Sequence, residues 1–213
     1  MKGVSFGGLH SFYEWGLILS EKEIKAPQPK TIEFEIEGSD GVLDYTEFFG
    51  GVKYENRQLT FKFYKANIVP DGFLALFSLV QNTIHGKKMQ VILDDDPAYF
   101  YYGRVTVDEW KANKRLGEIT ITVDAEPYKR AVSETVATKT VTSNANIVLV
   151  NDQMPAVPTI KTNAEFLIDF GSFNAVYSAG TFQIPELELG AGNNDIYVEG
   201  NGTITFTWRK GRL

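Results

Sequence analysis

The sequence predicts a mainly β protein of two domains that carries a single helix. Three observations lead to this prediction. Apolar and polar residues alternate with a period of two in several segments, one segment instead repeats apolar residues at helical spacing, and the composition changes near residue 130. We expect the first domain to span 1–130 and the second 131–213. Aromatic residues make up 13% of the chain and 19 residues are glycine, which suits short strands joined by tight turns.

The first domain contains three segments of clear alternation, 31–37, 58–63 and 118–124. Successive side chains of a strand point to opposite sides of its sheet, so each segment predicts one face in a core and one in water. Two further strands are expected at 88–93 and 99–107, joined by an acidic turn. The apolar side chains that we expect in the core are Ile32, Phe34, Ile36, Leu59, Phe61, Phe63, Ile119, Ile121 and Val123.

Glycine marks two connections of this domain. Asp40 and Gly41 follow the first alternating segment, and Gly50 and Gly51 precede the second. Glycine adopts a positive φ at no steric cost, which tight connections need. We therefore expect these four residues to form turns.

One segment departs from the β pattern. From Asp71 to His85, five apolar residues recur at spacings of three and four, which places them in one stripe of a helix. Pro70 precedes the stripe and Gly86 follows it, as is usual at helix ends. We expect a single helix packed over a sheet.

The second domain is richer in Thr, Ser, Val and Asn, carries less charge and has shorter strand patterns. A glycine-rich turn at 190–194 separates two of them. Many short strands with turn signals between them favour a small β-sandwich or a jelly roll. The strands that we expect span 146–150, 165–170, 181–189, 195–199 and 203–209.

Composition excludes several classes of function. A net charge of −6 argues against broad binding to nucleic acid, which needs clustered Lys and Arg. The absence of cysteine excludes disulfides, thiolate nucleophiles and cysteine-based zinc sites. The least charged segment, 69–86, is too polar to span a membrane. We expect no membrane association and no cofactor.

Two patterns suggest chemistry but lack the context that it needs. The segment 3–7 fits the G-x-S-x-G motif of a nucleophile elbow, yet only two residues precede it and no helix pattern follows. Asp94, Asp95 and Asp96 offer oxygen ligands for a cation, but adjacent side chains of a strand point to opposite faces, and Pro97 favours a turn. We expect no catalytic residue and no metal site.

Glu33, Glu35 and Glu37 share one face of the first alternating strand. Like charges this close are tolerated only in water or beside cations. Two interpretations stay open. The face is a solvated surface, or it lines the central channel of a ring and repels DNA that passes through it.

The order and spacing of these segments resemble the distal tail (Dit) proteins of long, non-contractile phage tails. The resemblance covers nearly the whole chain, although none of its motifs is specific by itself. It rests on GVSFGGLHSFYEWGLIL near the start, the turn block GSDGVLDYTEFFGG, the strand pair KKMQVILDDDPAYFYYGRV, the segment ITITVDAEPYKR and the final YVEGNGTITFTWRKGRL.

The resemblance implies a mainly β fold, with an N-terminal β-barrel or split sandwich that carries one helix and a C-terminal galectin-like β-sandwich. It implies a homo-hexamer, a ring closed by the N-terminal domains at the tail tip or baseplate. The ring would join the tail tube protein to a tail-associated or baseplate hub protein and to a receptor-binding protein, and DNA would pass through its channel. The protein would be made in the cytoplasm of the host bacterium and reside in the virion of a phage or prophage. The resemblance carries over no catalytic residue.

Aromatic residues of the first domain are candidates for the subunit contact or for the core: Trp15, Tyr45, Phe48 and Phe49. Two other functions stay open. A carbohydrate-binding, lectin-like module needs an exposed aromatic platform, which Trp208 and Tyr197 are available to supply. A glycosidase needs two carboxylates a short distance apart, and nothing in the sequence marks such a pair.

Overall fold

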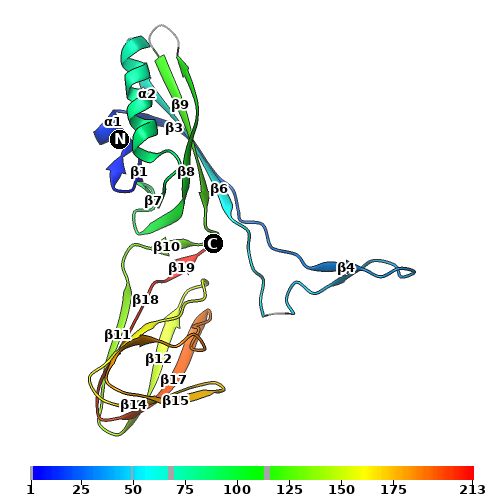
Figure 1. Ribbon diagram of the computed structural model, residues 1–213, viewed down its shortest axis with the longest axis vertical. Coiled ribbons are helices and arrows are strands. Elements are labelled where there is room, and N and C mark those ends of the chain that lie inside the picture. The colour runs from blue at the N-terminus through cyan, green and yellow to red at the C-terminus, as the bar shows by residue number, and fades with distance from the viewer. Residues whose placement is uncertain (1, 49, 67–69, 113–115) are drawn as a thin grey trace. The chain divides into compact units, whose positions relative to one another are not determined.

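The computed structural model describes residues 2–48, 50–66, 70–112 and 116–213, and strands make up most of its regular structure. The chain divides into two compact units, Met1–Pro127 and Tyr128–Leu213. Figure 1 shows the course of the chain through both units. The predicted mainly β fold, with a helix packed on the sheet of the first unit and a sandwich in the second, is confirmed.

The first unit is built on one antiparallel sheet with the strand order β2-β1-β7-β8-β9-β6-β3. In the part of the chain that the structure describes, this sheet is open and ends at β2 and β3. Its strands are β1 (Val4–Phe6), β2 (Leu9–His10), β3 (Ile18–Ile24), β6 (Arg57–Ala66), β7 (Lys88–Leu93), β8 (Tyr99–Ala112) and β9 (Leu116–Ala125). Among the residues that the structure describes, two helices accompany the sheet: α1 (Ser11–Trp15) and α2 (Pro70–Ile84).

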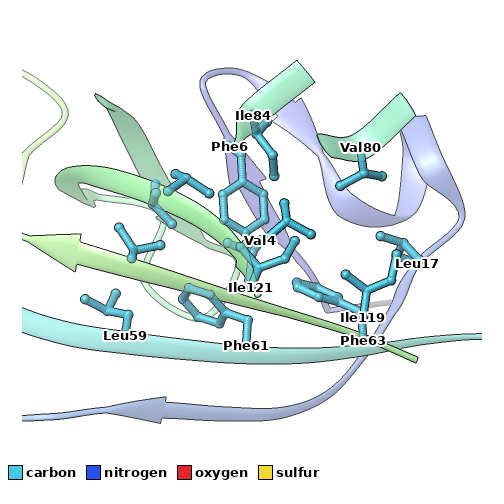
Figure 2. Close-up of a cluster of buried hydrophobic side chains, with 14 of the residues drawn as sticks. Val4, Phe6, Leu17, Leu59, Phe61, Phe63, Val80, Ile84, Ile119 and Ile121 are labelled. Atoms are coloured by element: carbon cyan, nitrogen blue, oxygen red, sulfur yellow. The ribbon is translucent and has the colours of Figure 1, made fainter. Parts of the chain in front are cut away.

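The core of the first unit lies between this sheet and α2. On β6 and β9, Phe61 lies opposite Ile121 and Phe63 opposite Ile119, so that the apolar faces of the two strands coincide. Figure 2 shows these side chains together with Phe6 from β1. All of them are buried, as the alternation of the two strands predicted.

Helix α2 covers the sheet with the stripe that the sequence predicted. Phe73, Val80 and Ile84 are buried against it. A Cβ at Gly117 of β9 would meet the ring of Phe73, so this glycine leaves the space that the ring occupies. The absence of a side chain on β9 therefore sets how closely α2 approaches the sheet.

The short helix α1 was not predicted. Its N-cap is His10, whose Nδ1 accepts hydrogen bonds from the backbone N–H groups of Phe12 and Tyr13. Histidine is not among the usual N-cap residues, so the sequence gives no start signal here. Gly16 closes the helix with a φ of 63°, in the left-handed region that glycine favours.

The second unit is a sandwich of two four-stranded antiparallel sheets, ordered β11-β18-β13-β16 and β12-β17-β14-β15. Inward-facing residues of both sheets, such as Phe166 and Phe206, form a separate buried cluster. A short pair, β10 with β19, lies outside the two sheets. The strands are β10 (Lys129–Ala131), β11 (Thr135–Val141), β12 (Asn144–Asn151), β13 (Thr159–Thr162), β14 (Phe166–Phe170), β15 (Phe173–Tyr177), β16 (Gly180–Gln183), β17 (Gly192–Gly200), β18 (Gly202–Trp208) and β19 (Gly211–Arg212).

One predicted strand of the second unit is shorter than expected. The alternation predicted a strand over 181–189, but β16 ends at Gln183. Pro185 follows closely, and proline has no N–H to donate to a neighbouring strand. The chain instead turns there, with the N–H of Leu187 donating to the carbonyl of Ile184.

Candidate functional site

The segment between β3 and β6 forms a two-stranded arm, residues 25–56, which we call the arm. Its outer part is the hairpin of β4 (Glu33–Glu35) and β5 (Val42–Asp44), which pair only with each other in the described residues. Closer to the sheet, the N–H of Lys30 donates to the carbonyl of Lys53, and that of Glu55 to Gln28. Figure 1 shows the arm as a continuation of β3 and β6.

A buried arginine fixes the root of the arm. The guanidinium of Arg57 donates to the carbonyl of Lys25 at 2.9 Å and to that of Pro127 at 3.2 Å. It also lies over the ring of Tyr101, with its Cζ 5.5 Å from the ring centroid. These contacts join both ends of the arm to the sheet.

The two faces of the hairpin differ sharply in character. The pairing places Glu33 opposite Asp44, so that these carboxylates share one face. Phe34 pairs with Leu43 on the other face, and its ring centroid is 5.8 Å from that of Tyr45. The ring of Tyr45 in turn contacts that of Phe48. The apolar face of the arm, as we use the term, consists of Ile32, Phe34, Ile36, Leu43, Tyr45 and Phe48.

No part of the described chain covers this apolar face. Phe34 is 56% exposed and Phe48 70% exposed, and every residue of β4 and β5 is exposed. The prediction that Ile32, Phe34 and Ile36 lie in a core of this chain is therefore wrong. The alternation was real, but it marks a face that remains open in the single copy. An isolated hairpin is marginally stable in water, and clustered exposed apolar side chains usually mark an interaction surface.

The arm also carries most of the net charge of the protein. Residues 25–56 contain seven carboxylates and three lysines, a net charge of −4 in a chain whose net charge is −6. The hydroxyl and the N–H of Thr46 hydrogen-bond to Asp44 and hold the pKa of that carboxyl below its usual range. Asp44 thus stays ionised at neutral pH.

The structure places most of the sequence-predicted site residues on the arm. Glu33 and Glu35 lie on β4, whereas Glu37 lies in the turn that follows, together with Asp40 and Gly41. Gly41, Gly50 and Gly51 have φ values of 79°, 85° and 56°. Tyr45 and Phe48 are exposed on the arm, and Phe49 lies outside the described residues.

Trp15 differs from the other candidate aromatics because it is buried. It is 6% exposed, and its ring stacks on that of Phe6 with the centroids 6.4 Å apart. This residue belongs to the core of the first unit. The sequence could not separate it from Tyr45 and Phe48 of the arm, because each of the three directly follows an acidic residue.

The G-x-S-x-G segment brings together a serine, a histidine and an aspartate, which sequence reasoning missed. Ser5 pairs with His10 between β1 and β2, and Nε2 of His10 is 3.0 Å from Oδ2 of Asp94. A catalytic triad requires the second ring nitrogen to face the serine. Here Nδ1 accepts from the two N–H groups at the start of α1, so neither ring nitrogen is available to Ser5. His10 and Asp94 fasten the N-terminal segment, and they form no triad with Ser5.

The aspartates that follow β7 form a turn with fixed partners. Asp94 also accepts from the N–H of Gly3 at 2.7 Å. Lys2 and Lys22 both pair with Asp95, and their hydrogen bonds lower the pKa of Asp95 to about 2. Among the described residues, no group of three or more His, Cys, Asp or Glu side chains is arranged to hold a metal ion.

The two aromatics proposed for a lectin-like platform do not share a surface. Trp208 lies on β18 and Tyr197 on β17, which belong to different sheets. Trp208 is only 5% exposed. It contributes to a shallow depression of about 410 Å³ that is lined mainly by threonine, charged and amide side chains. The second unit therefore offers no aromatic stacking surface at these positions.

Comparison with known proteins supports the fold. No family model and no curated protein matches the sequence. Among solved structures, the chain matches the SPP1 Dit (gp 19.1) protein, described as a paradigm of the hub adsorption apparatus in phages that infect Gram-positive bacteria. The match has a TM-score of 0.72 and 12% sequence identity, and it covers 100% of both chains. The resemblance noted in the sequence is thereby confirmed for the fold. No helix in the described ranges is long and apolar enough to cross a membrane.

Proposed function

We propose that this protein is a structural hub of a phage tail tip or baseplate, in which six copies form a ring around a channel for DNA. The observation that carries the proposal is the arm, whose apolar face is left uncovered by the described residues of its own copy. The likeness in fold to a hub adsorption protein along the entire chain adds to it.

The arm favours association of identical copies over chemistry. It is rooted by Arg57 and has one apolar and one acidic face, so it is built to bind a surface rather than to hold a small molecule. A patch that binds a different patch on the next copy makes a head-to-tail contact, and such contacts close into rings when the rotation allows. Six copies, as the resemblance implies, are our proposal for the ring.

The ring joins the tail tube protein on one side to a tail-associated or baseplate hub protein on the other. The galectin-like second unit holds the receptor-binding protein. The acidic face of the arm, with Glu33 and Glu35, is our candidate for the channel wall that repels DNA, and Glu37 extends it into the turn. In this proposal the protein is made in the host cytoplasm and resides in the virion, at the tail tip.

The test is the oligomeric state of the purified full chain. Size-exclusion chromatography with light scattering, at increasing concentration, should show a species of six copies, about six times the 23.9 kDa of one chain. Negative-stain images of that species should show a six-fold ring with a central hole. A protein that stays monomeric at all concentrations, both alone and with its tail neighbours, would overturn the proposal.

A further inference from the structure

A second uncovered surface of the first unit lies on the outer side of α2. The stripe Phe73, Val80 and Ile84 faces the core, so the opposite side of the helix is exposed. An exposed helix face usually carries several charged residues. The only ionisable residue in Pro70–Ile84 is Asp71, at the start of the helix.

The outer face of α2 has small residues along its crest and leucines on both flanks. Ala75, Ser78 and Asn82 are exposed at helical spacing and form the crest. Leu74 and Leu79, 45% and 54% exposed, lie on either side of it. Small crest residues allow the backbone of a partner to approach closely, while the leucines provide apolar contact.

The surface continues from α2 onto β8. Trp110 is partly exposed, and its ring centroid lies 5.5 Å from that of Phe73 and 5.7 Å from that of Phe77. We refer to the surface formed by Leu74, Ala75, Ser78, Leu79, Asn82 and Trp110 as the α2 face. It is uncharged, exposed and partly apolar, and the described residues of its own copy leave it open.

We propose that the α2 face binds the arm of the next copy, and that the apolar face of that arm packs against it. This inference rests on the proposed function, because it assumes that copies associate. Both surfaces belong to the first unit and both stay exposed within one copy, so the arm does not fold back onto its own helix. Each copy thus offers one arm and one receiving surface, which is the arrangement of a head-to-tail contact.

The dimensions of the two surfaces agree. The α2 face runs along the helix from Leu74 to Asn82, which at ~1.5 Å per residue is a length of ~12 Å. The apolar residues from Ile32 to Ile36 extend over ~13 Å at ~3.3 Å per residue.

The charges beyond these surfaces specify the direction of the arm. At the C-terminal end of α2, Lys87 donates to the carbonyls of Asn82 and Thr83, and Arg104 donates to that of Gly86. Neither cation has a carboxylate partner among the described residues. Glu37 and Asp40, in the turn of the arm, also lack a cationic partner there. An arm that points along α2 toward its C-terminus brings these opposite charges together, while its acidic face stays in water.

Site-specific photocrosslinking tests the inference on the full chain. A benzophenone amino acid replaces Phe34, and the variant is mixed with isotope-labelled wild-type protein and irradiated. We expect adducts between light and heavy copies on the tryptic peptide 66–87, which contains α2. The same probe at Tyr13, an exposed aromatic outside the arm, should not label this peptide.

Each outcome decides a different question. Labelling of another segment of the neighbouring copy, or the lack of any adduct between copies, overturns the pairing of the arm with α2. A six-fold ring with the adduct elsewhere would overturn this inference and leave the proposed hub intact. A chain that never associates would instead remove the proposed function.

A second measurement does not depend on the crosslinker. Leu79→Lys places a charge in the α2 face at an exposed position, so the monomer should fold normally and associate at least 10-fold more weakly. Combined with Phe34→Ala, it should add little to the loss caused by either change alone, because both disrupt one contact. Fully additive losses would show that the two residues act in separate contacts.

Discussion

Replacing Phe34 by alanine should weaken the association of copies without affecting the fold of each copy. Phe34 is 56% exposed in the single copy, and an aromatic side chain presents ~200 Å². Its contact with a neighbour would therefore bury ~100 Å² more apolar surface. At ~25 cal/mol per Å², this area is worth ~2.5 kcal/mol, or a ~60-fold change in the association constant of each contact.

Sedimentation velocity over a concentration series measures this change, and circular dichroism during heating measures the stability of the monomer. Phe34→Ala should shift assembly to higher concentration and leave the melting temperature within ~2 °C of the wild type. Tyr13→Ala, at a residue 73% exposed outside the arm, is the matched control and should assemble normally. Normal assembly of Phe34→Ala would refute the role of the apolar face. A large drop in its melting temperature would mean that the arm packs on its own copy.

Three further predictions concern the first unit itself. Gly117→Ala should destabilise the fold by ~1–3 kcal/mol in denaturant titrations, because the new Cβ meets the Phe73 ring; Gly180→Ala, with open space around it, should not. Asp95→Asn should reduce stability at neutral pH but not near pH 2. The reason is that the folded-state pKa of Asp95 is lowered from 3.8 to about 2, so its pairing is present above 3.8 and lost as the pH falls to about 2. An equal deficit of this variant at both pH values would contradict the assigned pairing. His10→Ala should lower the thermal stability by ~1 kcal/mol through loss of the α1 cap, and an unchanged melting curve would argue against the cap.

The sequence predicted those elements whose pattern depends on contacts within one chain. The stripe from Asp71 to His85 became α2, shifted by one residue at each end. The alternation around Phe61 and Ile121 became the facing strands β6 and β9. In these cases the face that is apolar in sequence is also the face that the chain itself buries.

The same alternation of apolar and polar residues led to a wrong prediction for Phe34, which is exposed and not part of the core. Alternation records that one face of a strand is removed from water, but not whether the cover comes from the same chain or from another copy. Trp208 is the opposite case. It was considered as part of an exposed aromatic platform, but it is buried in the sandwich of the second unit. The α2 face could have been noticed in the sequence, because the exposed side of this helix lacks charged residues. This indication was not used.

Within the described part of the chain, the outer edges of β4 and β5 are unpaired, and this has a consequence for the free protein before assembly. Unpaired strand edges beside an exposed apolar surface favour fibrous aggregation of identical segments. The carboxylates on each arm make two arms repel one another. This repulsion disfavours the stacking of arms on each other, but it does not disfavour the binding of an arm to an uncharged surface. Repulsion between whole copies should be weakest near the isoelectric point of about 5.1, where the net charge vanishes and unassembled protein should be least soluble.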